Sequence, residues 1–140
     1  MTPMISYQLA IDVQRPVRIR IGCLGCFLFP AGRYVYTGSA KRNLEARIAR
    51  HLRKNKALRW HIDWMLAAQG VEVAAVERSR VGECTLNQTL PGAILVPGFG
   101  ASDCRKGCGS HLRYLGAAPV IPGPKRTQDF PVRKSRRSIC

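Results

Sequence analysis

The chain has 140 residues, enough for one compact domain with a single core, and no apolar run approaches the ~18 residues of a membrane-spanning helix. Its 23 Lys and Arg residues outnumber 8 Asp and Glu residues, which gives a formal net charge of +15 and favours a polyanionic partner. Nucleic acid is the first such partner, and we expect no membrane association. Because no export signal is visible at the N-terminus, we expect a cytoplasmic protein.

The basic residues are concentrated in two stretches. Residues 41–59 contain a single acid, Glu45, and eight basic side chains: Lys41, Arg42, Arg47, Arg50, Arg53, Lys54, Lys56 and Arg59. Residues 119–140 contain six basic residues and one acid, in a context rich in Pro, Gly and Ser. This composition predicts a disordered basic tail after a folded domain at residues 1–118.

The first third of the chain has the period-two alternation of short strands. Apolar residues alternate with polar or small ones over residues 5–13 and again over 17–22. Turn residues follow, then a returning strand that begins at 27–29 and a further strand at 32–36. The pattern predicts a meander of antiparallel strands.

Helical spacing begins after Asn43, a residue type that favours helix N-caps. Over residues 44–55, Leu44, Ile48 and Leu52 recur every four residues and predict the buried stripe, with Arg47 and His51 one turn apart beside it. We expect further elements in the following order: a helix at 58–69 ended by Gly70, a strand at 71–77, a helix at 83–90, a short strand at 93–97, and a glycine-rich loop at 98–116 returning to a strand or short helix. The fold class is therefore α/β of the α+β type, a small and mainly antiparallel sheet flanked by helices.

A group of residues suited to phosphate chemistry lies where the strand at 32–36 meets the basic helix. Tyr34 and Tyr36 share a face of the strand, and Thr37-Gly38-Ser39 is a small-residue turn that lets a phosphate approach the backbone. A tyrosine pair in a strand is by itself more typical of a half-buried sheet surface. Arg47 and His51, 11 and 15 residues after Tyr36, add the groups that a phosphodiester site needs.

At these residues the chain resembles the GIY-YIG nuclease superfamily. That superfamily has Tyr-x-Gly at a strand end and an arginine and a histidine or tyrosine on the next helix, and Tyr36-Thr37-Gly38, Arg47 and His51 match this pattern. The wider wording YVYTGSA, RIARHL, RWHIDWML, GFGASDC and CGSHL, over residues 5–116, is similar to the Uri-type branch of that superfamily. The resemblance implies a GIY-YIG-like fold and a metal-dependent endonuclease, with DNA the expected substrate before RNA.

The resemblance also implies roles for individual residues. Tyr36 and His51 would activate the attacking water, Arg47 would stabilise the transition state, and Glu83 would bind Mg²⁺ or Mn²⁺. Glu77, the acid at the end of the preceding strand, competes with Glu83 as metal ligand. A solvated carboxylate is the plain alternative for either one.

The first half of the superfamily's motif is not present in literal form. Gly32-Arg33-Tyr34 is only two residues from Tyr36, too close to lie on an adjacent strand. Ser6-Tyr7-Gln8 is the better match, which makes Tyr7 a catalytic candidate. The long separation from Tyr7 to Tyr36 then predicts that residues 14–31 form an inserted hairpin.

Basic residues around this site are expected to contact nucleic acid. We predict this role for the following residues: Lys41, Arg42, Arg50, Lys54, Lys56, Arg59 and His61. For His61 and its neighbour Asp63 a site role and structural hydrogen bonding are equally good interpretations. A module that binds nucleic acid without cutting it is the alternative function.

The six cysteines, with no export signal, favour reduced thiols or a metal site over disulfides. Cys104, Cys108 and His111 have a Cys-x3-Cys-x2-His spacing that is compatible with structural zinc. A fourth ligand is missing nearby, so Cys23 or Cys26 would have to supply it. We favour the other interpretation, a loop with buried free thiols.

Overall fold

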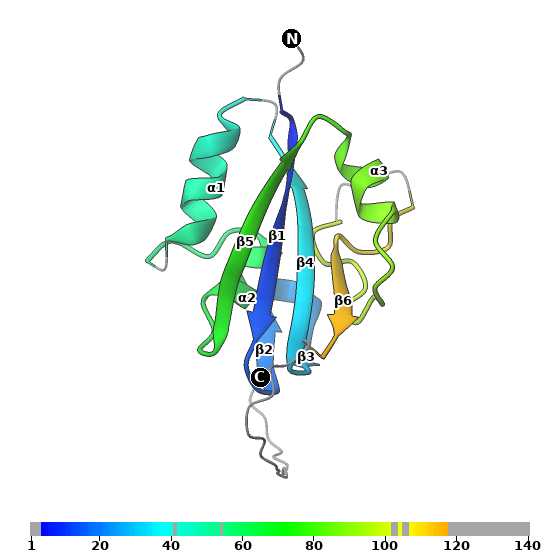
Figure 1. Ribbon diagram of the computed structural model, residues 1–140. Helices are drawn as coiled ribbons and strands as arrows, with labels where there is room; N and C mark the ends of the chain where they lie inside the picture. Colours follow the sequence, from blue (N-terminus) through cyan, green and yellow to red (C-terminus); the bar gives the residue numbers. More distant parts are fainter. Residues whose placement is uncertain (1–3, 41, 54, 102–103, 105–106, 118–140) are drawn as a thin grey trace.

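The computed structural model describes residues 4–40, 42–53, 55–101, 104 and 107–117. Its main element is a four-stranded sheet in the order β5-β1-β4-β6, shown in Figure 1. The strands are β1 (Ser6–Val13), β4 (Gly32–Ser39), β5 (Val71–Ser79) and β6 (Leu112–Gly116). All three strand pairings are antiparallel, so the predicted fold class, α+β with a mainly antiparallel sheet, is confirmed.

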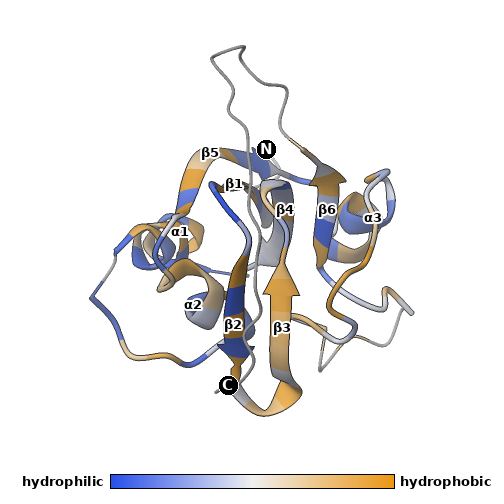
Figure 2. Cartoon of the chain, turned by 90° about the horizontal axis from the view of Figure 1, so that it is seen from below, coloured by the Kyte–Doolittle hydropathy of each residue, from blue (hydrophilic) through white to orange (hydrophobic). Residues whose placement is uncertain are grey.

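A separate hairpin interrupts the chain between β1 and β4. It consists of β2 (Val17–Ile21) and β3 (Gly25–Phe29), joined by a single 3₁₀ turn, and it confirms the hairpin predicted between Tyr7 and Tyr36. Figure 2 shows the hairpin together with α1 (Leu44–Leu52) and α2 (His61–Leu66) on one side of the main sheet. The third helix, α3 (Glu83–Gln88), packs beside β4 and β6, toward the β6 edge of the sheet.

Alternation along the strands decides which face of the sheet is buried. Leu9 and Ile11 of β1 have no solvent exposure, and they pair with Tyr36 and Tyr34 of β4, so four large side chains share the covered face. The opposite face is mostly polar or small, as one-sided antiparallel sheets usually are, with Val35 as an apolar exception. On that face Gln8, for example, is paired with Thr37.

The same register places one end of β1 beside the end of β4. Tyr7 is opposite Gly38, and a Cβ atom at position 38 would collide with the Tyr7 hydroxyl oxygen. Gly38 is therefore required for the close approach of Tyr7, independently of any φ angle. Sheet pairing therefore brings Tyr7 to the end of β4, where the sequence predicts the site.

Several predicted boundaries are wrong. The helix predicted at 44–55 ends at Leu52, and the one predicted at 58–69 spans only His61–Leu66. Leu52 is 51% exposed, whereas His51 is buried at 2%, so the buried stripe of α1 shifts from Leu52 onto His51. Asn43 has left-handed dihedrals and its side chain makes no capping hydrogen bond.

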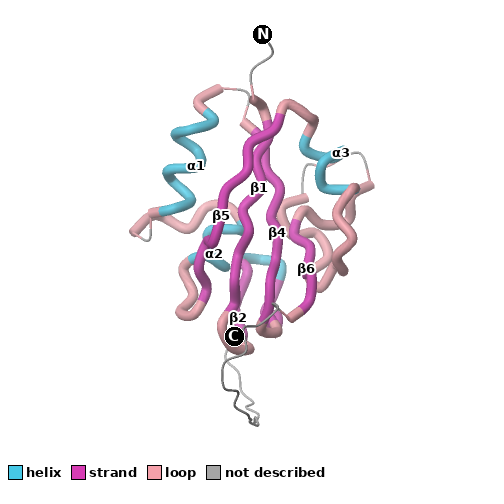
Figure 3. Tube along the Cα trace, in the orientation of Figure 1, coloured by secondary structure: helices cyan, strands magenta, loops and turns pink. Residues whose placement is uncertain are grey.

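The region between α3 and β6 also differs from the prediction. Residues 93–97 form no strand: Ala93 makes an isolated bridge to Tyr114, and Figure 3 shows loop between α3 and β6. No helix among the described residues has the length and apolar character needed to cross a membrane. The predicted tail at 119–140 lies outside the described residues.

Candidate active site and an adjacent cysteine–histidine cluster

Four of the five sequence-predicted catalytic residues line one pocket of about 570 Å³. Tyr7 and Tyr36 come from adjacent sheet strands, Arg47 comes from α1 and Glu83 opens α3. His51 does not line the pocket directly but contacts Tyr7 behind it. The remaining lining residues are Gly38, Ser39, Arg59, Trp60, His61, Cys84, Gly100, Cys104 and His111.

Tyr7 and His51 form a buried pair at the floor of this site. The Tyr7 hydroxyl lies 2.6 Å from Nε2 of His51, and the two side chains are 44 positions apart in the chain. Burial lowers the pKa of His51 to about 4, and the positive charge of Lys56 adds to the effect. The imidazole is therefore neutral at neutral pH, and its Nε2 can accept a proton from Tyr7.

Neither tyrosine is ionised at neutral pH. Burial raises the pKa of Tyr7 above its ordinary value, and the nearby Arg47 offsets this only in part. Burial also raises the pKa of Tyr36, and the proximity of Tyr7 adds to the shift. A phenol in this site can accept or donate a proton only in concert with a base, and neutral His51 is placed to be that base.

Arg47 is held so that its positive charge lines the pocket. One of its terminal guanidinium nitrogens donates to the Ser39 carbonyl at 3.0 Å, and the guanidinium carbon lies 4.6 Å from the centroid of the Trp60 ring. Arg50 lies three residues later in the same helix. Its guanidinium carbon is also over Trp60, 4.4 Å from the ring centroid. Cation–π contact with a half-buried tryptophan limits the freedom of both arginines.

Glu83 is held on both carboxylate oxygens. Oε1 accepts a hydrogen bond from the Ser39 hydroxyl at 2.6 Å, and Oε2 lies 2.6 Å from Nδ1 of His111, although the ring N–H is not well aligned with that oxygen. Burial alone would raise the pKa of Glu83, but His111 and Ser39 lower it below its ordinary value. The carboxylate is therefore charged, and it faces the pocket with about a quarter of its side chain exposed.

The competing acid, Glu77, lies elsewhere. It is exposed on β5 and is paired with Gln8, on the face of the sheet that points away from Tyr7 and Tyr36. The structure thus brings Glu83 to the tyrosines and leaves Glu77 outside the pocket.

The predicted nucleic-acid contacts divide into two groups. Arg59 and His61 line the pocket, and Arg42 is exposed at the start of α1. Arg50 and Lys56 have internal partners: Arg50 binds the carboxylate of Asp63, and Lys56 donates to the carbonyls of Arg50 and His51. Lys41 and Lys54 lie outside the described residues.

Asp63 has a structural function. Its buried carboxylate accepts from Arg50 at 2.8 Å and from the backbone N–H groups of Arg59 and Trp60, which fixes the start of α2. His61 is different, because it lines the pocket while its Nδ1 accepts from the backbone N–H of Gly100. Asp63 is therefore engaged in structural hydrogen bonds, whereas a site role for His61 stays a prediction.

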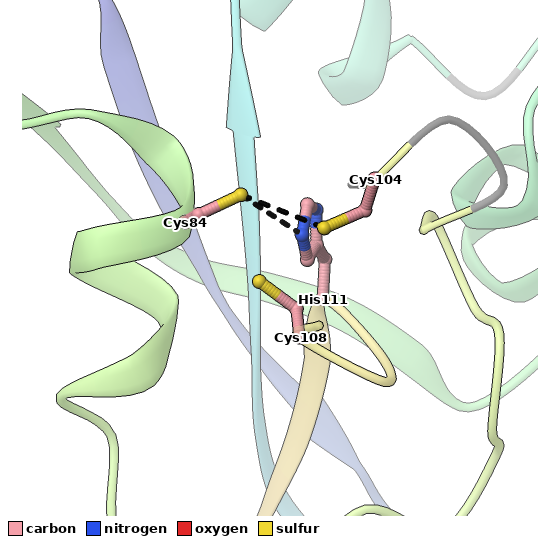
Figure 4. Close-up of side chains that lie close together, drawn as sticks. All are labelled: Cys84, Cys104, Cys108 and His111. Carbon is pink, nitrogen blue, oxygen red and sulfur yellow. Dashed lines mark hydrogen bonds between the residues drawn. The ribbon is translucent and has the colours of Figure 1, made fainter. Parts of the chain in front are cut away.

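Next to Glu83, the structure brings together three thiols and one imidazole that could hold a metal ion. The sulfur atoms of Cys84, Cys104 and Cys108 and a ring nitrogen of His111 all lie within 4.8 Å of one another (Figure 4). The fourth member is Cys84, so the expectation that Cys23 or Cys26 would complete the set is wrong. The local spacing of Cys104, Cys108 and His111 could not indicate Cys84, which lies far from them in the sequence. Its position directly after Glu83, the predicted metal ligand, was the available signal.

The electrostatics of this cluster differ from those of the tyrosine pair. Burial would lower the pKa of His111, but Glu83 and the thiols of Cys104 and Cys108 raise it to about 9. Burial, together with the neighbouring Cys108 and Cys104, raises the pKa of Cys84 to about 12. Without a metal, the Cys84 thiol and the His111 imidazole are therefore both protonated at neutral pH.

Comparison with known proteins identifies the family. The model of a family described as domain of unknown function DUF123 matches residues 6–122. The chain belongs to this family. Within the DUF123 domain the match spans every strand and helix described above, from β1 to β6, and it includes both the tyrosine pair and the cysteine–histidine cluster. No curated protein and no solved structure matches the chain significantly.

Proposed function

We propose that this DUF123 domain is a metal-dependent endonuclease that hydrolyses phosphodiester bonds of nucleic acid, with DNA as the first candidate substrate. The main support is that one pocket combines the hydroxyls of Tyr7 and Tyr36, the cation of Arg47 and the carboxylate of Glu83. These four residues come from four separate elements. Their roles are those implied by the resemblance to GIY-YIG nucleases of the Uri type.

The pair of Tyr7 and His51 supplies the base. Neutral His51 accepts the phenolic proton of Tyr7 at Nε2 while the Tyr7 oxygen takes a proton from the attacking water. The water oxygen then forms its bond to phosphorus as the bond to the leaving oxygen breaks. Tyr36, on the adjacent strand, orients the water with its hydroxyl.

Arg47 stabilises the charge that develops on the phosphoryl oxygens. Its contacts with the Ser39 carbonyl and with Trp60 hold the guanidinium in place before substrate binds, so little reorganisation is needed during the reaction. The charge of Arg47 is always present, because a guanidinium does not deprotonate in proteins.

Glu83 is the candidate ligand for Mg²⁺ or Mn²⁺. Its ionised oxygens are hard donors that suit such ions, and they retain lone pairs beyond the contacts with Ser39 and His111. A bound divalent cation would neutralise phosphate charge and stabilise the leaving oxygen. The adjacent thiols are soft ligands and do not suit Mg²⁺.

The charge of the protein supports a nucleic-acid substrate. Net charge of +15 attracts phosphate backbones of every kind, and Arg59 continues the positive lining of the pocket beyond Arg47. The alternative, a module that binds nucleic acid without cutting, shares all of these electrostatic features. It differs only in having no use for Glu83.

The test is a cleavage assay with purified full-length protein and Mg²⁺ or Mn²⁺, across duplex, branched and single-stranded DNA and structured RNA. We expect cleavage of at least one DNA form, and a loss of roughly 10²–10³-fold in rate for Arg47→Ala. Glu83→Gln should abolish metal-dependent cleavage while binding, measured by fluorescence anisotropy, is retained.

Two matched variants serve as controls. Glu77→Gln removes an exposed carboxylate outside the pocket, and Arg18→Ala removes an exposed arginine on the inserted hairpin, so both should cleave at the wild-type rate. Binding without cleavage by the wild-type protein on every substrate would establish the non-catalytic module instead. Equal loss in Glu83→Gln and Glu77→Gln would remove Glu83 from the site.

A further inference from the structure

The cluster beside Glu83 has the dimensions of a tetrahedral metal site. The sulfur atoms of Cys84 and Cys104 are 3.6 Å apart, and Cys84 Sγ lies 3.9 Å from His111 Nε2. A tetrahedral zinc ion with Zn–S bonds of about 2.3 Å separates its sulfur ligands by about 3.8 Å. The observed sulfur separation is close to that expected for two ligands of one zinc ion, and it is far longer than the ~2.0 Å of a disulfide.

The ligand set itself selects zinc. Three thiols and one imidazole form a Cys₃His set, which is typical of closed structural zinc sites, and thiolates disfavour Mg²⁺ and Ca²⁺. Cys108 and His111 are buried, at 4% and 3% exposure, so the site is closed on the side of the protein interior. The Gln88 amide donates to Cys108 Sγ at 3.4 Å, a contact that stabilises a thiolate.

The chain around this cluster has little regular secondary structure. Residues 89–111 contain no helix or strand among the described positions, apart from the single bridge at Ala93. A segment of this length without regular structure lacks the backbone ladders that hold the sheet. Glycines with positive φ at positions 107 and 109 turn the chain tightly, so that Cys108 and His111 both reach the cluster.

The orientation of His111 connects this cluster to the pocket. Its Nε2 faces Cys84, and its Nδ1 lies 2.6 Å from the Glu83 carboxylate. Histidines that bind zinc through one ring nitrogen commonly direct the other at a carboxylate, which fixes the tautomer and the ring orientation. Glu83 has the position that the carboxylate takes in such a carboxylate–histidine–zinc arrangement.

We propose that Cys84, Cys104, Cys108 and His111 bind one structural zinc ion, which holds Glu83 in the pocket through His111. The zinc site stands on its own geometry. The consequence for Glu83 rests on the proposed nuclease function. In this arrangement the zinc ion cross-links the loop between α3 and β6. Through His111 it also positions Glu83, the proposed ligand of the catalytic Mg²⁺ or Mn²⁺.

Elemental analysis of the full-length protein, purified under reducing conditions, tests the site directly. We expect one zinc per chain. Replacement by Co²⁺ should give the intense visible bands of a tetrahedral site and the near-ultraviolet absorption of thiolate-to-cobalt charge transfer. Both readouts are independent of nuclease activity.

Variants assign the ligands. Cys84→Ser should lose the stoichiometric zinc and weaken the thiolate absorption, whereas Cys23→Ser, which removes an exposed free thiol on the inserted hairpin, should leave both unchanged. Glu83→Gln should retain zinc, with an affinity reduced about 10–100-fold. Since Glu83→Gln also removes the proposed cleavage, zinc retained with cleavage lost separates the two proposals.

Four outcomes would overturn the zinc site. They are a metal-free wild-type protein without the cobalt spectrum, iron in place of zinc, equal zinc loss in Cys23→Ser and Cys84→Ser, and a disulfide between Cys84 and Cys104 in the reduced preparation. If instead zinc is present and wild-type protein cuts no substrate, the zinc site stands and the nuclease proposal fails.

Discussion

The two walls of the pocket are built in different ways. Tyr7 and Tyr36 stand on paired sheet strands, and α1 places His51 against Tyr7 over the same hydrophobic core. Glu83, on the opposite wall, begins a six-residue helix that leads into a long loop. The first wall is held by backbone ladders and buried apolar surface. The second has no such ladder: the loop is held by individual backbone hydrogen bonds, by Val96 and Phe99 in the core, and by the cysteine–histidine cluster.

This difference indicates how the site divides its tasks. The tyrosine wall can be rigid without any ligand, because its residues belong to the main core. The glutamate wall has less regular secondary structure, so with the proposed zinc site we expect its geometry to respond to metal. The following predictions test that contrast, from the largest expected effect to the smallest.

Removal of zinc should loosen one wall and leave the other intact. Structural zinc sites bind with roughly 10 kcal/mol or more, so chelation under reducing conditions should raise amide hydrogen exchange over residues 89–111 by a thousandfold or more. Exchange in β1 and β4 should change little. The measurement is hydrogen exchange followed by mass spectrometry, and uniform exchange increases across both walls would contradict the contrast.

Asp63→Ala should be the most damaging single change on the tyrosine wall. It removes the partner of half-buried Arg50 and leaves the N–H groups of Arg59 and Trp60 unpaired, at a cost of about 3–5 kcal/mol in the free energy of unfolding. Urea unfolding measures it. A cost below about 1 kcal/mol would show that Trp60 and the two arginines over it do not depend on Asp63.

Acidification should destabilise the tyrosine wall through His51. Its pKa is lowered to about 4 in the folded protein, so between about pH 6.5 and 4 the unfolded chain binds the proton and the folded one does not. Stability is therefore full above pH 6.5, and about 3 kcal/mol is lost as the pH falls toward 4. His51→Gln should lack this part of the pH dependence of unfolding, whereas a slope equal to that of wild type would be inconsistent with a buried neutral His51.

Tyr7→Phe and Tyr34→Phe form a matched pair on one face of the sheet. Each removes a hydroxyl with an internal partner, His51 for Tyr7 and the Pro30 carbonyl for Tyr34, so both should lose about 1–2 kcal/mol of stability. Only Tyr7→Phe should slow cleavage, by roughly 10²-fold. Equal rates for the two variants would remove Tyr7 from the chemistry.

Leu52→Ala should have the smallest effect. Because Leu52 is 51% exposed, its truncation should change stability by less than about 0.5 kcal/mol. Ile48→Ala, one turn earlier and 3% exposed, should cost about 2–4 kcal/mol. Thermal unfolding compares the two, and a large loss for Leu52→Ala would restore the predicted stripe.

Local patterns in the sequence were sufficient for most of the fold. Alternation located β1 and β2, and the helical period located α1, because both periods follow from backbone geometry alone. They failed at Leu52, where a polar residue, His51, is buried instead because Tyr7 offers it a hydrogen-bond partner. They failed again at residues 93–97, where an apolar run makes only one bridge to the sheet.

The sequence by itself determined that a tyrosine-bearing strand leads into a basic helix, and that three of the four metal-type ligands lie close together near β6. Only the tertiary structure decided that Tyr7 meets His51, that Glu83 rather than Glu77 enters the pocket, and that Cys84 completes the cluster. The physical reason is separation along the chain. Periodicity reports on neighbours within a turn or a strand, whereas these contacts join positions 20 to 44 residues apart and depend on sheet register and loop closure.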